Sequence, residues 1–274
     1  MNFDGLAQIA SAAADVAAEL LSTQQPGRLT SKGDRDYASE VDYRIELTLR
    51  QFLGQRTPHI GFVGEELEPD DSAHESWWAL DPIDGTVNFA HDLPLCGISL
   101  GLIHRNRPVL GVIDLPFLHS RYWAVEGRGA WRDGRPIRVS GTSRLADALV
   151  TIGDYAVGPD ADDKNQERLQ LTQLLAGQVL RIRMLGSAAL DLAWLAEGKT
   201  DASIALSNRP WDVAAGVIIA REAGAVVSDL DGSDHTTKSL ATIASCPDLD
   251  DALHELIRSP IGPQPSHRLG RDLD

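Results

Sequence analysis

Three short segments of the chain concentrate acidic side chains next to apolar runs. They are residues 64–66 (Gly-Glu-Glu), 81–86 (Asp-Pro-Ile-Asp-Gly-Thr) and 211–216 (Trp-Asp-Val-Ala-Ala-Gly). Taken alone, each has an ordinary interpretation: a solvated pair of glutamates, a turn built on Asp-Pro and Asp-Gly, and an aspartate that caps a helix. The second segment favours chemistry, because an apolar run that ends in two nearby carboxylates directs both at one point.

Residues 81–86 carry donors for both a cation and a phosphate. The apolar residues 77–80 predict a buried strand that ends at Asp81, and Gly85 lets the backbone approach a ligand closely. A helix that begins at Gly85-Thr86 would present free N–H groups, which bind phosphate. Mg²⁺ prefers oxygen ligands, completed by water and substrate phosphate. No histidine or cysteine lies in these segments, so zinc is disfavoured.

A covalent aspartyl-phosphate mechanism is the first alternative. Phosphatases of the haloacid-dehalogenase type use an Asp-x-Asp-Gly-Thr pattern whose first aspartate is the nucleophile. Here the spacing is Asp-x-x-Asp-Gly-Thr, which turns the second carboxylate to another direction. The segment also follows residue 80, behind two predicted helices, instead of closing the first strand. Both differences disfavour this mechanism.

The composition excludes several classes of partner. Twenty-five basic and 40 acidic residues give a net charge of −15, which argues against binding to nucleic acids or to anionic membranes. Hydrophobic residues make up 43% and charged residues 24%, as in a globular protein. No apolar run is long enough to span a membrane, and the acidic N-terminal stretch does not resemble a signal peptide. Cys96 and Cys246 are expected to be reduced thiols in a cytoplasmic protein.

The periodicity predicts an α/β (α+β) protein in two halves. Apolar spacing indicates helices over residues 6–20 and 41–52, with a polar turn or loop at 31–36 between them. Strand signals at 98–103, 109–113, 121–125, 130–131 and 137–139 predict an antiparallel meander. The second half alternates strands (149–152, 179–183, 202–206, 226–228, 240–243) with helices (165–175, 187–197, 212–223, 248–257). We expect halves at 1–140 and 141–260, and a disordered tail at 261–274.

Taken together, the motifs resemble those of the inositol monophosphatase family of Mg²⁺-dependent, lithium-sensitive phosphatases. Residues 81–86 followed by Asn88-Phe89, residues 211–216 and residues 64–66 match its signature segments in order, and residues 127–140 resemble its hairpin region. The resemblance spans about residues 5 to 258. It implies a layered α/β/α/β/α sandwich, as also found in fructose-1,6-bisphosphatases, with two or three Mg²⁺ per site. It further implies a homodimer.

The resemblance also assigns roles to individual residues. The metal ligands are Glu65, Asp81, the backbone carbonyl of Ile83, Asp84 and Asp212. The catalytic residues are Glu65, Thr86 and Asp42, with Asp42 as the partner of Thr86. The substrate-binding residues are Asp84, Gly85, Thr86, Gly186, Ser187 and Asp212. Lys32, on a mobile loop, and Glu66 support the site.

The implied reaction is hydrolysis of a small phosphate ester by a metal-activated water, without a phosphoenzyme. Glu65, or Thr86 with Asp42, takes the proton of that water. A non-catalytic relative that binds a metabolite or a partner protein is the alternative from another class. Every ligand position keeps an oxygen donor, which argues against it.

One departure concerns the substrate. Members that hydrolyse inositol phosphates have a sugar-contacting glutamate seven residues before the last metal-ligand aspartate, and here that position is Ala205. Specificity for inositol 1-phosphate is therefore in doubt. Histidinol phosphate, another sugar or polyol phosphate, and fructose 1,6-bisphosphate as a secondary substrate remain open. A 3′-phosphoadenosine phosphate is less favoured, because relatives that use it are often longer.

Overall fold

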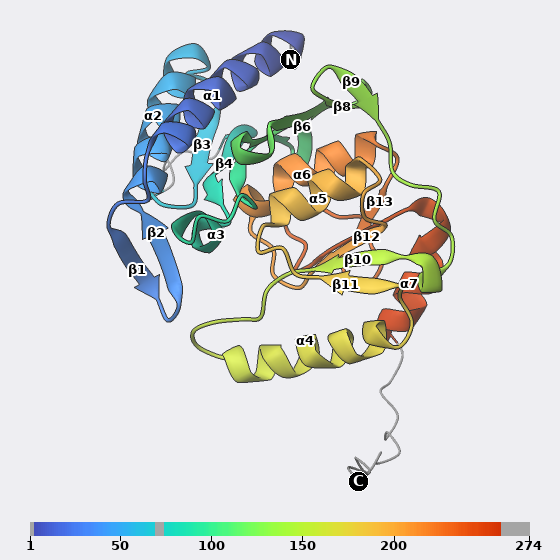
Figure 1. Ribbon diagram of the computed structural model, residues 1–274. Coiled ribbons are helices and arrows are strands. Elements are labelled where there is room, and N and C mark those ends of the chain that lie inside the picture. Colours follow the sequence, from blue (N-terminus) through green and yellow to red (C-terminus); the bar gives the residue numbers. More distant parts are fainter. Residues whose placement is uncertain (1–2, 69–73, 259–274) are drawn as a thin grey trace.

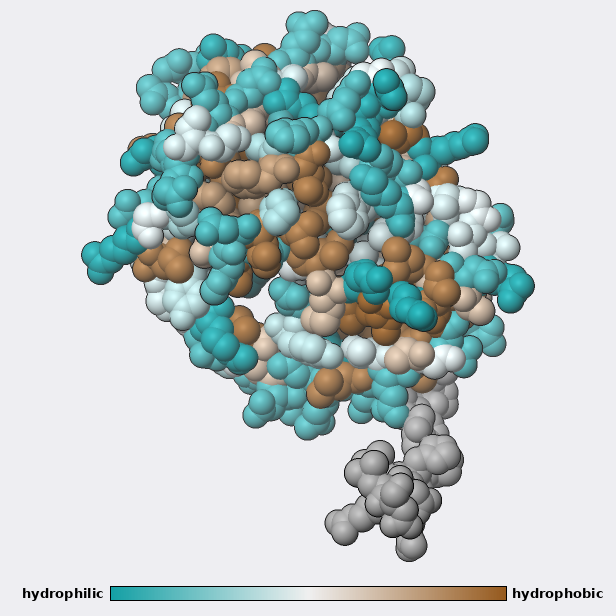
Figure 2. All heavy atoms as spheres, in the orientation of Figure 1, coloured by the Kyte–Doolittle hydropathy of each residue, from teal (hydrophilic) through white to brown (hydrophobic). Residues whose placement is uncertain are grey.

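The computed structural model describes residues 3–68 and 74–258. The expected tail at 261–274 lies outside them. No helix in this part of the chain is both long and apolar enough to cross a bilayer. On the face drawn in Figure 2, hydrophilic side chains cover most of the margin, and hydrophobic ones gather towards the middle.

The first half builds a seven-stranded sheet with two helices on one face (Figure 1). Its strands lie in chain order and are antiparallel except for the first pair. They are β3 (Gly61–Gly64), β4 (Ser76–Asp84), β5 (Gly97–His104), β6 (Arg107–Leu115), β7 (Ser120–Val125), β8 (Ala130–Arg132) and β9 (Arg135–Ile137). The apolar stripes of α1 (Phe3–Thr23) and α2 (Glu40–Arg56) pack on this sheet. A short helix, α3 (Thr86–Ala90), follows β4.

The other face of this sheet is covered by α5 (Ala188–Ala196) and α6 (Pro210–Glu222). Two glycines let α6 come close to the strands. A Cβ on Gly101 would lie 2.8 Å from the Cβ of Ala214, and one on Gly111 would lie 2.5 Å from the carbonyl oxygen of Ala215. This close approach fixes the start of α6, and with it Asp212, against β5.

A second, five-stranded sheet lies beyond α5 and α6 (Figure 1). Its strand order is β11 (Arg181–Arg183), β10 (Leu149–Ile152), β12 (Ala202–Ala205), β14 (Thr242–Ser245) and β13 (Val226–Ser228). The helices α4 (Ala161–Ala176) and α7 (Pro247–Arg258) cover its outer face. The order of layers is helix, sheet, helix, sheet, helix, which confirms the expected layered fold. The boundary near residue 140 stays a prediction, although the first sheet ends at Ile137 and the second begins at Leu149.

Three local expectations outside the acidic segments were wrong. Residues 31–36 are not simply a loop, because β1 (Leu29–Gly33) and β2 (Asp36–Ser39) pair as a hairpin. All of β1 is exposed, so no alternation of apolar residues marked it. The strand expected at 137–139 ends at Ile137, since the Val139 N–H bonds the carbonyl of Ala223 instead of a strand. The last strand is shifted to Thr242–Ser245 by its pairing with β12 and β13.

Candidate active site

An irregularity in β4 turns two carboxylates towards the same end of the sheet. Asp81 pairs with Ser99 of β5, but the ladder shifts register before it resumes at Asp84 and Gly97. The Ile83 N–H donates to Asp81 Oδ1 at 3.0 Å, which holds the extra residues in place. The strand thus continues through the acidic segment to Asp84, whereas the sequence predicted that it would end at Asp81.

Gly85 follows directly, with a φ of +94°. A side chain there would be strained, and its Cβ would lie 2.9 Å from the Leu95 carbonyl oxygen and 3.2 Å from that of Gly186. The glycine therefore allows the turn into α3 to sit against the segment that leads into α5. This brings two of the expected substrate-binding residues, Gly85 and Gly186, close together.

The three acidic segments converge in space. Glu65, Asp81 and Asp212 each place one carboxylate oxygen within 4.8 Å of the others. Glu65 is held there because β3 runs parallel to β4 and the Glu65 N–H donates to the Leu80 carbonyl at 3.2 Å. Asp212 is held by α6, where the Ser99 hydroxyl donates to the Trp211 carbonyl at 3.1 Å.

Burial and mutual repulsion make these carboxylates costly to ionise. Burial raises the pKa of Asp81 well above its usual value, and Glu65 and Asp84 raise it further. Burial, Asp84 and Glu65 likewise raise the pKa of Asp212. Burial raises the pKa of Asp84 to about 6, even though the Ala189 N–H and the Ser187 hydroxyl oppose the rise. An all-oxygen donor set with this excess negative charge fits a hard divalent cation.

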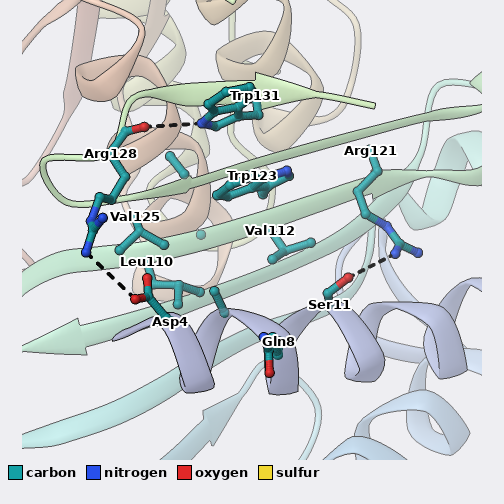
Figure 3. A pocket seen from close by; sticks show the side chains of 13 residues that line it. Asp4, Gln8, Ser11, Leu110, Val112, Arg121, Trp123, Val125, Arg128 and Trp131 are labelled. Atoms are coloured by element: carbon teal, nitrogen blue, oxygen red, sulfur yellow. Dashed lines mark hydrogen bonds and ion pairs between the residues drawn. The ribbon is translucent and has the colours of Figure 1, made fainter. Parts of the chain in front are cut away.

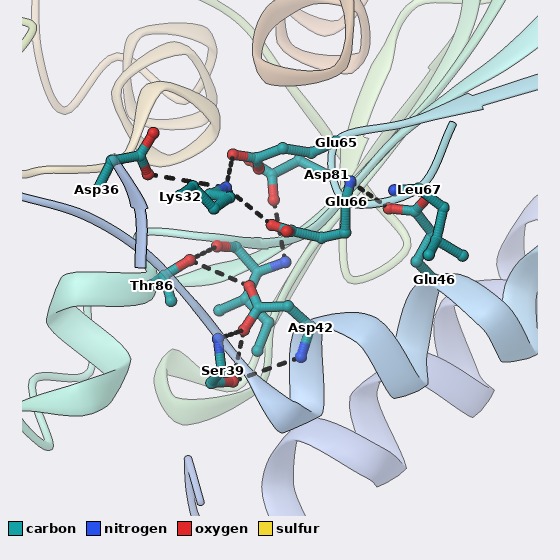
Figure 4. Close-up of polar contacts among 11 residues, drawn as sticks. Lys32, Asp36, Ser39, Asp42, Glu46, Glu65, Glu66, Leu67, Asp81 and Thr86 are labelled. Carbon is teal, nitrogen blue, oxygen red and sulfur yellow. Dashed lines mark hydrogen bonds and ion pairs between the residues drawn. The ribbon is translucent and has the colours of Figure 1, made fainter. Parts of the chain in front are cut away.

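Lys32 supplies the cationic group within this cluster (Figure 4). Its Nζ lies 2.6 Å from Glu65 Oε1, 3.0 Å from Glu66 Oε1 and 3.8 Å from Asp36 Oδ1. Although burial favours the neutral amine, Glu65 and Glu66 more than offset it and raise the Lys32 pKa. The hairpin of β1 and β2 thus carries an ammonium group to the expected metal ligands.

Thr86 and Asp42 form a hydrogen-bonded pair beside the acidic cluster (Figure 4). Thr86 Oγ1 lies 3.1 Å from Asp42 Oδ1 and 3.0 Å from the Ile83 carbonyl oxygen. The other oxygen of Asp42 accepts from Ser39, whose hydroxyl also caps α2. Asp42 is fully buried, so its carboxylate is fixed by Ser39 on one side and by Thr86 on the other.

The start of α5 is tied to Asp84. Ser187 is the N-cap of α5, and its hydroxyl donates to Asp84 Oδ2 at 2.9 Å. The Ala189 N–H donates to the same oxygen. The Asn88 side-chain amide bridges to the Leu185 carbonyl at 2.8 Å. The expected substrate-side residues therefore belong to the same site as the expected metal ligands.

Two buried carboxylates at the site were missed by the sequence reasoning. Glu46 accepts the backbone N–H groups of Glu66 and Leu67, and it has no exposed surface. Its signal in the sequence is the polar series Asp42, Glu46, Arg50, which recurs at helical spacing among apolar residues. Asp191, in the first turn of α5, is also buried and lines a cavity beside Asp84.

Size alone does not locate the site. A cavity of about 570 Å³ lies between α1 and strands β6 to β8 (Figure 3). The rings of Trp123 and Trp131 stack in its wall, with 5.7 Å between the ring centroids. Its titratable groups are Asp4, Arg121 and Arg128. A cavity of about 140 Å³ adjoins Asp84, Asp212 and Ser187 instead. The smaller cavity is the one next to the converging carboxylates.

The model of the inositol monophosphatase family matches residues 3–261. The chain belongs to this family. Inositol-1-monophosphatase ImpA of Mycolicibacterium smegmatis is 36% identical over 230 residues, which cover 83% of this chain and 82% of that protein.

Solved structures agree with the assignment. The extragenic suppressor protein suhB from Bartonella henselae superposes with a TM-score of 0.86 at 30% identity, covering 93% of this chain and 98% of that one. The inositol monophosphatase from Anabaena (Nostoc) sp. PCC 7120 gives a TM-score of 0.82 at 30% identity, and the match covers 94% of this chain and 96% of that chain. This member of the inositol monophosphatase family is a phosphoric monoester hydrolase.

Proposed function

We propose that this family member hydrolyses the phosphate ester of a small polyol, sugar or related metabolite with the help of two or three Mg²⁺. The observation that carries the proposal is the convergence of three carboxylates within 4.8 Å of one another. The residues that would hold the ions are Glu65, Asp81, the carbonyl of Ile83, Asp84 and Asp212. Mg²⁺ bound there would neutralise the substrate phosphate and lower the pKa of a coordinated water.

The chain's own residues orient the ester. Gly85 is the N-cap of α3 and Thr86 is its first residue, so the Thr86 N–H group has no partner within the helix. Gly186 lies close to Gly85, and Ser187 bonds Asp84. We assign the phosphate to this space, because backbone donors there offset its charge. The leaving group then points into the cavity that adjoins Asp84 and Asp212.

Thr86 and Asp42 are the better supported acceptors of the water's proton. The single proton of the Thr86 hydroxyl has two acceptors, Asp42 and the Ile83 carbonyl. When the carbonyl serves as a ligand, this proton points to Asp42, and the Thr86 oxygen is free to accept from water. Glu65 is less suited to this role, because Lys32 donates to it at 2.6 Å.

A ligand role for Asp81 is favoured over nucleophilic attack. The side chain is only 3% exposed, and one of its oxygens is held by the Ile83 N–H. We therefore expect no phosphoenzyme, in contrast to the haloacid-dehalogenase mechanism. Trapping with beryllofluoride tests this point, since an aspartyl-phosphate enzyme would bind the analogue covalently at Asp81.

The decisive experiment measures phosphate release with Mg²⁺, with and without lithium. The panel holds inositol 1-phosphate, histidinol phosphate, glycerol 2-phosphate, fructose 1,6-bisphosphate and 3′-phosphoadenosine 5′-phosphate. Mg²⁺-dependent activity that lithium inhibits and that Asp84→Asn abolishes supports the proposal. Metal binding without turnover of any ester would favour a metabolite- or partner-binding relative.

Two further expectations concern the protein's setting. We expect a homodimer, which light scattering coupled to gel filtration tests, and a cytoplasmic location.

A strongly acidic surface would repel anionic substrates at long range. Attraction must therefore be local, from the bound cations and from Lys32. The binding of nucleic acids or of anionic membranes is not expected.

A further inference from the structure

The cavity beside Asp84 and Asp212 has a volume of about 140 Å³, compared with about 570 Å³ for the cavity between α1 and strands β6 to β8. Its walls come from the starts of α5 and α6, from β12 and from the segment that follows β10. A space of this size takes a compact group. Given the proposed function, on which this inference rests, that group is the leaving-group side of the ester.

Asp191 brings a carboxylate into this cavity. The residue is 4% exposed, and its Oδ1 has no hydrogen-bond partner among the residues that the structure describes. Buried carboxylate oxygens normally accept hydrogen bonds, since leaving one unpaired costs free energy. A hydrogen-bond donor on a bound molecule would satisfy this oxygen.

The neighbouring wall offers little competition for such a donor. Ser203 and Ala205 lie two apart on β12 and share one face of the strand, where Ala205 contributes only a methyl group. Thr242 pairs with Ala205 across the sheet, but its hydroxyl already bonds Asn208 Oδ1 at 3.2 Å and His235 Nε2 at 2.9 Å. Three other aspartates line the cavity: Asp84 and Asp212 are the proposed metal ligands, and Asp154 is exposed. Asp191 is therefore the buried carboxylate of the cavity that is left to bind the substrate.

We propose that Asp191 determines substrate specificity by accepting a hydrogen bond from a hydroxyl or ammonium group on the leaving-group side of the ester. Esters that lack such a donor leave the buried carboxylate unpaired and are hydrolysed less efficiently. Asp191 thereby supplies a polar contact on the side of the substrate where Ala205 has none.

Wild-type protein tests this with matched linear esters. Propyl phosphate has no donor on its chain, 3-hydroxypropyl phosphate adds a hydroxyl, and 3-aminopropyl phosphate adds an ammonium group. We expect kcat/KM to favour at least one donor ester over propyl phosphate by 10-fold or more. Comparison of kcat/KM for the hydroxyl ester and the ammonium ester shows whether the site prefers a polyol-like substrate or an amine. Equal kcat/KM for all three overturns the inference but leaves the proposed function standing, whereas no hydrolysis of any ester here or in the Mg²⁺ panel overturns both.

Asp191→Asn then assigns the preference to this residue. The variant should reduce the preference for the donor ester, measured as the ratio of its kcat/KM to that of propyl phosphate, at least 5-fold. Asp201→Asn is the matched control, because Asp201 is also buried but bonds Ser140 and the Leu149 N–H outside the cavity. It should leave the ester preference unchanged. An equal loss for all three esters in Asp191→Asn would show a structural role and overturn the inference.

Discussion

The Glu46 carboxylate holds the backbone of Glu66, with 2.7 Å between Glu46 Oε2 and the Glu66 nitrogen. Its other oxygen accepts the Leu67 N–H at 3.0 Å, so one side chain fixes the peptide that follows Glu65. Gly64 makes this possible, because any Cβ there would overlap the Glu46 carboxylate. The Arg50 Nη2 atom lies 3.6 Å from Glu46 Oε1 and partly balances the buried negative charge of Glu46.

Glu46→Gln should weaken metal binding. The amide keeps the size of the side chain but places an NH₂ group against the N–H group of Glu66 or Leu67. The backbone that follows Glu65 therefore loses one hydrogen bond. Residues that orient metal ligands typically contribute 10- to 100-fold in affinity. We expect a rise of about 10-fold in the Mg²⁺ dissociation constant, measured by calorimetry.

Glu40→Gln is the matched control, since Glu40 lies exposed in the first turn of the same helix. It should bind Mg²⁺ as the wild type does. Identical Mg²⁺ affinity in both variants would contradict the role of Glu46, provided that thermal unfolding shows both to be folded.

Thr86→Val should lower kcat by about 100-fold or more, because it removes the hydroxyl that bonds Asp42 and that, in the proposed reaction, accepts from the attacking water. Valine has nearly the same shape, so KM should change little. Thr86→Ser restores the hydroxyl and should recover most of the rate. Steady-state kinetics of the three proteins decides between this role and a packing role, in which Ser would be no better than Val.

The sequence predicted the metal-ligand candidates better than their supports. Asp81, Asp84 and Asp212 lie in contiguous motifs, so their types and spacing already indicated a shared site. Glu46 and Asp191 are single acidic residues outside the three motifs. The N–H groups that Glu46 accepts lie 20 and 21 positions away, and Asp191 Oδ1 has no hydrogen-bond partner among the described residues. The β1–β2 hairpin was missed for a related reason, since its strands bury little and pair through their backbones.

Lys32→Met should destabilise the metal-free protein more than the Mg²⁺-bound one. Without Mg²⁺, Lys32 is the cation that contacts Glu65 and Glu66, and its side chain is only 21% exposed. Removing it leaves both carboxylates unpaired, which should cost about 1 to 3 kcal/mol. Bound Mg²⁺ compensates for part of that loss. Thermal unfolding in EDTA and in Mg²⁺ measures the difference, and an equal shift in both would contradict the prediction. Lys238→Met, at an exposed position, is the control.

Acid should weaken the fold through His235. Burial, with Arg221 next, lowers the pKa of His235 to about 4, although Asp229 and Asp234 oppose the shift. Its Nε2 lies 3.1 Å from Asn208 Nδ2 and 2.9 Å from Thr242 Oγ1, which is consistent with a neutral ring.

The direction of the pH effect follows from linkage. The unfolded chain takes up the histidine proton near pH 6.5, whereas the folded chain does so only near pH 4, so stability falls as the pH drops between these values. From pH 7.5 to 5 the loss attributable to His235 is about 2 kcal/mol. The raised pKa values of Asp81 and Asp212 act in the opposite direction, because the metal-free folded state binds their protons more tightly. Urea unfolding of wild type and His235→Gln at both pH values isolates the histidine. The wild type should lose about 2 kcal/mol more than the variant on acidification, and an equal loss would show that His235 does not carry the effect.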